Sequence, residues 1–264
     1  MLPFLHNNNI RTEPVVWTET AVPSGLEAVI VRSPWDYYYK HAEFMEWFKN
    51  NSTDGTPFFN SSSTIIKNFN KIYLRELSER GVKIPVTEFI EKGGSFDLAG
   101  YFRANGSKKL VIKPLVSGGA HKTTVVTSDN LSESQKELDE IISETGGMVQ
   151  EFLPQIHAGE LSFLFFNGKY SHTAIKIPAQ GDFRVQNYFG GVYKKYPEDE
   201  KLISEASEIL KISGEDTLYA RIDGLVINGK FNLIELEIFE PALFLHTDES
   251  AAANFGKAIL ERLS

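Results

Sequence analysis

The sequence predicts an α+β protein of mixed helices and strands, and three observations lead to this fold class. Stretches with apolar residues three and four apart, typical of helices, alternate with short apolar runs typical of buried strands. These stretches interleave without the strict βαβ rhythm of a parallel sheet. The dipeptide Asn228-Gly229, a strong hairpin signal, stands between two strand-like stretches.

Composition limits the class of protein further. The 264 residues suffice for one large or two small domains, and 42% are hydrophobic while 23% are charged. These values exclude intrinsic disorder, and the absence of cysteine excludes disulfide scaffolds, thiolate catalysis and zinc–cysteine sites. A net charge of −8 argues against a nucleic-acid partner. No run approaches the ~20 apolar residues of a membrane span, and the N-terminus lacks signal-peptide features. We therefore expect a cytoplasmic protein without a membrane partner.

The N-terminal part predicts two short strands, a helix and a linker. The strand-like runs are EPVVW at 13–17 and LEAVIVR at 26–32. Residues 36–49 predict a helix, because Phe44, Trp47 and Phe48 recur at three and four. Residues 50–63 are rich in Asn, Ser, Thr, Gly and Pro, which indicates a linker, and we place a domain boundary there.

The remaining elements follow the same reasoning. A helix over 70–80, with Asn70 as its N-cap, should end at Gly81 in the left-handed conformation that glycine favours. The later strand-like stretches are 83–90, 109–115, 122–127, 148–153, 160–166, 167–177 and the two halves of 218–239. The later helices are 133–145, 201–212 and 251–263.

The stretch 218–239 separates charged from apolar side chains, because apolar residues occupy even positions and charged residues occupy odd positions. The charged residues are Arg221, Asp223, Glu235 and Glu237. Three carboxylates on one face repel one another, and Mg²⁺, which prefers oxygen ligands, would offset that repulsion. A solvated strand face with Arg221 pairing one acid is the alternative.

The loop length decides whether the two charged faces match across the hairpin. A two-residue loop at 228–229 pairs positions with an odd sum and places Asp223 and Glu235 on opposite faces. We therefore predict a three-residue loop, 227–229, with Gly229 in a left-handed bulge. That loop brings all the charged side chains onto one face.

Two loops and two lysines suggest anion binding. Lys113 ends an apolar strand, and the glycine-rich stretch 117–123 after it joins two strands and could cradle phosphate oxygens, although an ordinary turn is the alternative. Lys71 opposes the dipole at a helix start unless an anion lies nearby, and a solvated lysine is its alternative. Arg184, in the flexible loop 181–191, suits phosphate or carboxylate recognition, unless this is a plain surface loop.

Six stretches in a fixed order carry a family resemblance. They are VRSPWDYYYKHAEFMEW, NKIYLRELSERGVKIPVT, LVIKPLVSGGAHKT, VQEFLPQIHAGELSFLFF, KIPAQGDFRVQNYFGG and YARIDGLVINGKFNLIELEIFEPALF. On the basis of these stretches, the chain resembles the ATP-grasp superfamily. It is most similar to the branch of glutathione synthetase and ribosomal-protein glutamate ligase, and within that branch to the O-ureido-serine cyclo-ligase-like proteins. The resemblance covers nearly the whole chain.

The resemblance implies an ATP-grasp fold with a reduced N-terminal α/β subdomain. The N-terminal subdomain would span 1–62 and the ATP-grasp domain 63–264, with a small lid at about 82–149. Relatives place a strand and a loop before the helix to which Leu2–His6 would belong. The first strand of that subdomain is therefore expected to be missing here.

The resemblance also implies roles for individual residues. Lys71 and Lys113 would contact the ATP phosphates, beneath a loop that includes Ser117, Gly118 and Gly119. Gln150, Glu151, Phe152 and Leu153 would contact adenine, and Glu160 the ribose hydroxyls. Arg184 and Gln186 would cover the γ-phosphate and substrate, and Arg221 would stand near the reacting carbonyl. Asp223, Glu235 and Glu237 would hold Mg²⁺, as two ions. Many relatives have Asn as the last ligand, so Glu237 adds a negative charge.

The resemblance therefore implies an ATP-dependent ligase that joins a small carboxylate substrate to an amine through an acyl phosphate. A kinase of a hydroxyl acceptor and a non-catalytic Mg-nucleotide-binding module are the alternatives. The N-terminal subdomain and residues such as 239–244 would shape substrate selectivity. Arg32 is a weaker candidate for the substrate pocket, and a homodimer is left open. His121, His157 and His172 are interpreted as ordinary residues.

Overall fold

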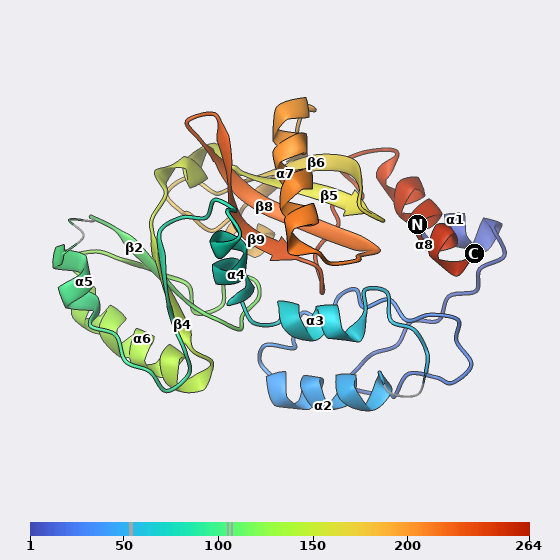
Figure 1. Cartoon of the computed structure of the whole chain (residues 1–264), viewed down its shortest axis with the longest axis horizontal. Coiled ribbons are helices and arrows are strands. Elements are labelled where there is room, and N and C mark those ends of the chain that lie inside the picture. Colours follow the sequence, from blue (N-terminus) through green and yellow to red (C-terminus); the bar gives the residue numbers. More distant parts are fainter. Residues whose placement is uncertain (53–54, 105, 107) are drawn as a thin grey trace.

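The computed structural model describes residues 1–52, 55–104, 106 and 108–264. Two antiparallel sheets dominate it (Figure 1). The smaller sheet has the order β1-β4-β2-β3 and consists of β1 (Thr87–Ile90), β2 (Leu110–Pro114), β3 (Thr124–Val126) and β4 (Gly147–Glu151). The larger sheet has the order β7-β6-β5-β8-β9 and consists of β5 (Glu160–Phe166), β6 (Lys169–Ile177), β7 (Val192–Lys195), β8 (Tyr219–Ile227) and β9 (Lys230–Glu237). The α+β prediction is confirmed.

Helices pack on both sheets and on the N-terminal segment. They are α1 (Leu2–Asn7), α2 (His41–Asn51), α3 (Ser62–Asn68), α4 (Tyr73–Glu79), α5 (Leu98–Ala104), α6 (Leu131–Glu144), α7 (Glu200–Ser213) and α8 (Ala251–Leu263), with short 3₁₀ turns at Pro154–Ala158 and Asn187–Phe189. Helices α5 and α6 lie on the smaller sheet, and α7 crosses the larger one (Figure 1). Helices α1 and α8 bring the two termini together at one end. Among the described residues, no helix is both long and apolar enough to cross a membrane.

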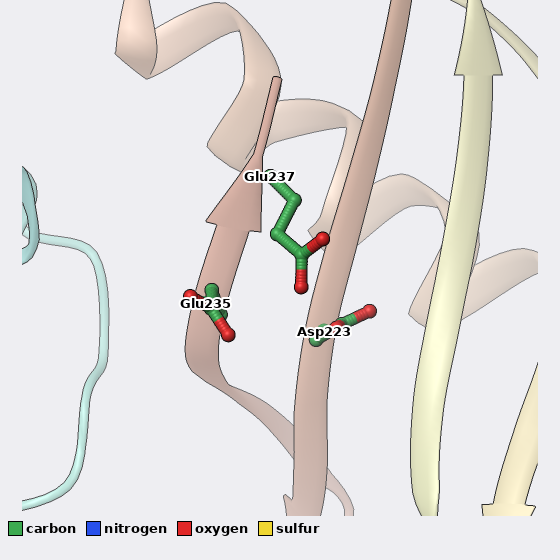
Figure 2. Close-up of side chains that lie close together, drawn as sticks. All are labelled: Asp223, Glu235 and Glu237. Carbon is green, nitrogen blue, oxygen red and sulfur yellow. The ribbon is translucent and has the colours of Figure 1, made fainter. Parts of the chain in front are cut away.

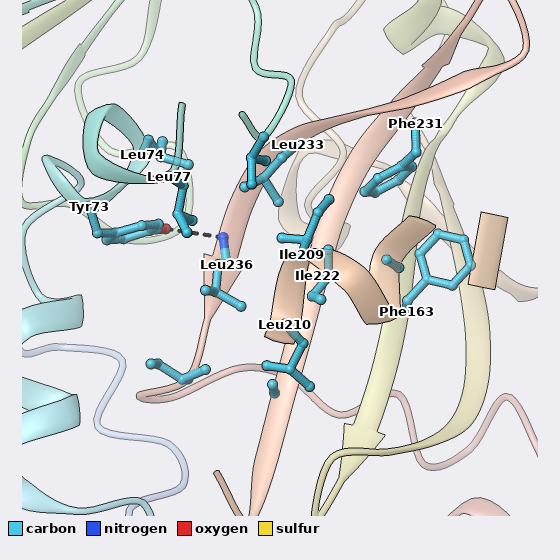
Figure 3. Close-up of a cluster of buried hydrophobic side chains, with 14 of the residues drawn as sticks. Tyr73, Leu74, Leu77, Phe163, Ile209, Leu210, Ile222, Phe231, Leu233 and Leu236 are labelled. Carbon is cyan, nitrogen blue, oxygen red and sulfur yellow. Dashed lines mark hydrogen bonds between the residues drawn. The ribbon is translucent and has the colours of Figure 1, made fainter. Parts of the chain in front are cut away.

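The largest apolar core lies between α4, α7 and the larger sheet (Figure 3). Strand β9 forms an edge of that sheet. The backbone N–H of Leu236 on β9 donates to the Tyr73 hydroxyl, and that of Ile238, just after β9, donates to Asn68 Oδ1, both at 3.1 Å. These bonds attach the segment between α3 and α4 to the hairpin of β8 and β9, and therefore position Lys71 beside that hairpin.

The hairpin loop differs from the three-residue loop predicted above. Ile227 pairs with Lys230, and the turn between them has two residues with left-handed φ angles of 51° and 71°. The change of face occurs inside the hairpin, at a β-bulge: Gly224 pairs with Leu233 while Asp223 pairs with Glu235. The predicted loop is therefore wrong, but the bulge supplies the even register that brings the charged residues together.

Gly224 permits this bulge. A Cβ at that position would lie 2.3 Å from the Asn232 carbonyl oxygen and 2.5 Å from the Phe231 ring. Such distances are too short for any side chain, so β9 can approach closely at a glycine. As a result Leu233 and Leu236 both enter the core although their positions differ in parity.

Several sequence predictions need correction in the N-terminal part. The expected strands at 13–17 and 26–32 are absent from the described residues, where only an isolated bridge joins Val29 to Phe58. Local propensity does not supply a partner strand, and Val31 instead packs into an aromatic core with α2. Helix α2 begins later than predicted, because turns occupy residues 34–40.

The helix expected over 70–80 begins only at Tyr73. Asn70 Oδ1 accepts a bond from the Ile72 N–H, so Asn70 forms a turn before α4 rather than its N-cap. Gly81 has φ +92°, as expected for the residue that ends this helix. The helical prediction for Leu2–His6 is confirmed by α1.

Candidate active site

One cleft of about 460 Å³ collects the predicted site residues. Its lining comes from both sheets, from the loop after β2, from residues 183–188 and from the segment after β9. Every residue that the resemblance placed in a site lines it: Lys71, Lys113, Ser117, Gly118, Gly119, Gln150, Glu151, Phe152, Leu153, Glu160, Arg184, Gln186, Arg221, Asp223, Glu235 and Glu237. Their proximity is thus established, whereas their individual roles stay predictions.

The three carboxylates of the hairpin converge (Figure 2). Asp223 lies on β8 and Glu235 and Glu237 on β9, and one oxygen of each lies within 4.8 Å of the others. Burial raises the pKa of Glu237 well above its ordinary value; Arg221 opposes this shift, while Glu235 and Asp223 add to it. This cluster offers only oxygen atoms as ligands, so it fits a hard divalent cation such as Mg²⁺.

Asp223 is nevertheless strongly held by protein groups. Its carboxylate accepts bonds from Arg221 at 2.8–3.1 Å, from the Ser162 hydroxyl at 2.7 Å and from Lys176 at 2.7 Å. Burial alone would raise the pKa of Asp223, but Arg221 and Lys176 outweigh it and lower that pKa to about 2. Asp223 is therefore ionised at neutral pH.

The two predicted phosphate lysines lie beside this cluster. Lys71 Nζ is 3.0 Å from Glu235 Oε1 and donates to the Ser117 carbonyl at 2.7 Å. Lys113 Nζ donates to Gln150 Oε1 at 3.1 Å and, within the described chain, has no carboxylate within 4.0 Å. Burial lowers the pKa of Lys113 to about 8, with Lys71 adding to the effect and Glu235 opposing it. Lys113 is therefore a half-buried cation available to an anionic ligand.

Lys176 is a site residue that the sequence analysis missed. It lies on β6, directly opposite Glu160 on β5, and forms ion pairs with both Glu160 and Asp223. Burial would lower its pKa, but these two carboxylates outweigh burial and raise it. A lysine between Ile175 and Ile177, inside an apolar strand, was the signal available in the sequence.

The glycine-rich loop joins β2 and β3, as predicted. Gly119 has φ +59°, and a Cβ there would lie 2.5 Å from the Tyr188 hydroxyl. A Cβ on Gly118 would lie 3.1 Å from the Tyr38 ring. Glycine therefore allows this loop to pass close to side chains on both sides of the cleft mouth.

The other end of the cleft is more apolar. Phe152 packs against Phe183, with ring centroids 6.3 Å apart, and Gln150 Nε2 donates to Thr87 Oγ1 at 2.8 Å. The guanidinium of Arg184 pairs with Asp182 at 2.8 Å, and the Oε1 atom of Gln186 is buried without a partner. This end thus combines aromatic rings with polar groups from β4, an arrangement suited to a heteroaromatic base.

Two residues from the sequence analysis, Arg32 and His172, lie outside the site's polar groups. Arg32 is not among the residues that line the cleft; it donates to the Pro241 carbonyl at 3.0 Å and lies over the Tyr219 ring. His172 is buried and contacts the Leu243 carbonyl at 3.0 Å, as an ordinary structural histidine would.

Two antiparallel sheets that enclose one cleft with these charges define the class of ATP-grasp ligases, and solved structures share the arrangement. The crystal structure of D-cycloserine synthetase DcsG matches with a TM-score of 0.88 at 23% identity, covering 100% of this chain and 94% of that chain. D-alanine–D-alanine ligase from Bacillus anthracis complexed with ATP matches with a TM-score of 0.62 at 16% identity, covering 86% and 82%.

Sequence comparisons identify the family. The model of the prokaryotic glutathione synthetase ATP-grasp domain matches residues 95–251, and the model of the N-terminal domain of D-cycloserine synthetase DcsG matches residues 1–60. The chain therefore belongs to the family of the prokaryotic glutathione synthetase ATP-grasp domain. It is also 26% identical over 270 residues to the cycloserine biosynthesis protein DcsG of Streptomyces lavendulae, covering 96% of this chain and 89% of that protein. The resemblance noted in the sequence is confirmed. The exact boundaries at 62 and 63 and the lid at 82–149 stay predictions.

Proposed function

We propose that this chain activates a small carboxylate substrate with ATP and joins the resulting acyl phosphate to an amine or a similar nucleophile. The observation that carries this proposal is the meeting of Lys71 and Lys113 with the carboxylates of Asp223, Glu235 and Glu237 in one cleft. Phosphoryl transfer needs positioning and charge neutralisation more than covalent catalysis, and this cleft offers both signs of charge at close range.

The proposed reaction has two steps. A substrate carboxylate oxygen attacks the γ-phosphorus, the bond to ADP breaks, and an acyl phosphate forms. The amine nitrogen then attacks the acyl carbon, phosphate leaves with the bonding electron pair, and the nitrogen loses a proton. When bound at Asp223, Glu235 and Glu237, Mg²⁺ would supply positive charge to the phosphate oxygens.

The chain's own residues would position the reactants. Lys71 and Lys113 would hold the phosphates, and Phe152 with Gln150 would bind adenine at the apolar end of the cleft. Arg221 lies between the carboxylates and the segment after β9, where its NH1 donates to the Ala242 carbonyl at 3.1 Å. From there it would stabilise the oxyanion that forms on the acyl carbon. The similarity to D-cycloserine synthetase and D-alanine–D-alanine ligase, whose names indicate amino-acid-like compounds, favours an amino-acid-like substrate for this chain.

The test is the release of phosphate and ADP from MgATP, measured with a panel of carboxylates in the presence and absence of hydroxylamine as a general nucleophile. A ligase releases both products only when a carboxylate is present, and hydroxylamine yields a hydroxamate. A kinase would form ADP and keep the phosphate on its product. A nucleotide-binding module would raise its melting temperature with MgATP and never turn over.

A further inference from the structure

Glu240 is a carboxylate of the cleft to which the reaction above assigns no role. It follows β9 and lines the cleft beside the segment 239–244. The other acids deep in the cleft each have a cation: Asp223 and Glu237 pair with Arg221, Glu235 with Lys71, and Glu160 with Lys176. Among the described residues, no cation lies within 4.0 Å of Glu240, a situation it shares in this cleft only with the solvent-exposed Glu151.

Three cations act electrostatically on Glu240, and each contacts other groups. Lys71 is bound by Glu235 and the Ser117 carbonyl, and Arg221 by its two carboxylates. Arg32 donates to the Pro241 carbonyl through NH2; its NH1 is buried without a partner, and among the described residues no carboxylate, Glu240 included, lies within 4.0 Å of its guanidinium nitrogens. Burial raises the pKa of Glu240 to about 7, with Glu235 adding to the rise and Arg221 and Lys71 opposing it. A positively charged ligand group is therefore what this carboxylate lacks.

Two aromatic side chains lie near Glu240, those of Trp35 and Tyr38. The Trp35 indole N–H donates to the Glu240 backbone carbonyl at 3.1 Å. A Cβ built on Gly118 would lie 3.1 Å from the Tyr38 ring and 3.7 Å from Glu240 Oε1, so this ring and this carboxylate meet at the same point of the glycine-rich loop. Trp35 and Tyr38 both line the cleft. Aromatic faces attract cations, and an ammonium group loses less by leaving water for such a wall than a strongly hydrated Mg²⁺ does.

We infer that Glu240, with the rings of Trp35 and Tyr38, binds an ammonium group of the substrate. The substrate that is activated would therefore carry a free amine as well as a carboxylate, as amino acids and their derivatives do. This inference rests on the proposed ligase function for the identity of the bound compound. It concerns a site distinct from the carboxylates of Asp223, Glu235 and Glu237, because Glu240 lies beyond the end of β9.

The experiment compares D- and L-amino acids with their N-acetyl counterparts. Phosphate release is measured with MgATP and hydroxylamine, and binding to the MgADP-loaded protein is measured by calorimetry. The wild-type chain should prefer free-amine compounds about ten- to hundredfold, the range of a hydrogen bond to a charged group. Glu240→Gln should raise their KM by a similar factor, leave the KM for MgATP unchanged and abolish the preference over the N-acetyl compounds.

Two further variants keep the test specific. Glu249→Gln removes an exposed acid nearby in the chain and should leave every value unchanged. Trp35→Leu removes one aromatic wall and should weaken free-amine binding while the protein still binds MgADP. A melting temperature and an MgADP affinity close to wild type show that each variant is folded.

The outcomes separate the two proposals. Equal use of N-acetyl and free-amine compounds, an unchanged preference in Glu240→Gln, or an equal rise in the KM for MgATP would overturn the ammonium site. So would the failure of every free-amine compound to bind. If free-amine compounds bind in a Glu240-dependent manner but no phosphate is released, the ligase proposal fails and the ammonium site stands.

Discussion

Replacing Lys176 with methionine should destabilise the protein strongly, because it leaves buried charge without a partner. Lys176 bridges Glu160 and Asp223, and its side chain is 6% exposed, against 10% for Glu160 and 1% for Asp223. Asp223 would keep Arg221 and Ser162, but Glu160 would lose the only ion pair it forms among the described residues. Breaking a buried pair typically costs about 3–5 kcal/mol.

The assay is thermal unfolding followed by far-UV circular dichroism. With about 2–4 °C per kcal/mol for a chain somewhat smaller than this one, the melting temperature of Lys176→Met should fall by roughly 6–20 °C at pH 8. The matched control is Lys169→Met on the same strand, whose exposed side chain pairs with Glu261 at the surface and should matter little.

The loss should depend on pH in a defined direction. Burial already raises the pKa of Glu160 above its ordinary value, and removal of Lys176 should raise it further. An acid whose pKa is higher in the folded state than in the unfolded state destabilises the fold once it is ionised. The deficit of Lys176→Met should therefore be full at pH 8 and shrink as the pH is lowered and Glu160 takes up a proton.

A double variant decides whether this reasoning is correct. Lys176→Met with Glu160→Gln removes the unpaired carboxylate and should recover about 1–3 kcal/mol relative to Lys176→Met alone. If Lys176→Met melts like the wild type, or if the double variant is no more stable than the single one at pH 8, the bridge does not hold these strands together.

Three further predictions follow from the cleft and its hairpin. Asp223→Asn and Glu235→Gln should each abolish phosphate release while calorimetry still detects binding of adenosine, and activity retained in both would contradict the metal assignment. Gly224→Ala should lower the free energy of unfolding by about 1–3 kcal/mol, because the new methyl group would lie 2.3 Å from a carbonyl oxygen of β9. The control is Gly147→Ala on β4, where a Cβ meets only side-chain atoms at 3.2–3.4 Å. An equal effect of the two variants on urea unfolding would refute the bulge argument. Because the pKa of Lys113 is about 8, Lys113 loses its charge as the pH rises from 7 to 9, and the affinity for ADP should weaken over that range. Lys113→Arg should flatten this pH profile in calorimetric titrations, since arginine stays charged. The same profile in both proteins would exclude Lys113 as the source of the pH dependence.

The charged face of the hairpin could be predicted from the sequence because strand side chains alternate. The requirement for an even register between Asp223 and Glu235 was also correct. The predicted position of the bulge was wrong, because a bulge in the loop and a bulge inside the hairpin change the register by the same amount. Gly224 carried the missing signal, because glycine inside a strand often marks a bulge or a close approach of two backbones.

Long-range pairing explains the other differences. The runs at 13–17 and 26–32 have strand-like composition, but a strand forms only where a partner strand is available, and no local pattern reports that. Lys176 and Glu240 were overlooked for a related reason. Lys176 lies in a strand and Glu240 follows one, and neither stands out locally. Their roles depend on carboxylates and aromatic rings that are distant in sequence.

The outer border of β9 has a consequence for how copies of this protein behave in solution. A bare strand border is a template on which a foreign strand can dock and begin aggregation. Here two of its amide groups are already occupied by the Lys83 carbonyl and the Tyr73 phenol, and the amide of the next residue, Ile238, is occupied by the Asn68 carboxamide. The segment that delivers Lys71 to the cleft thus also shields the acid-bearing hairpin from self-association.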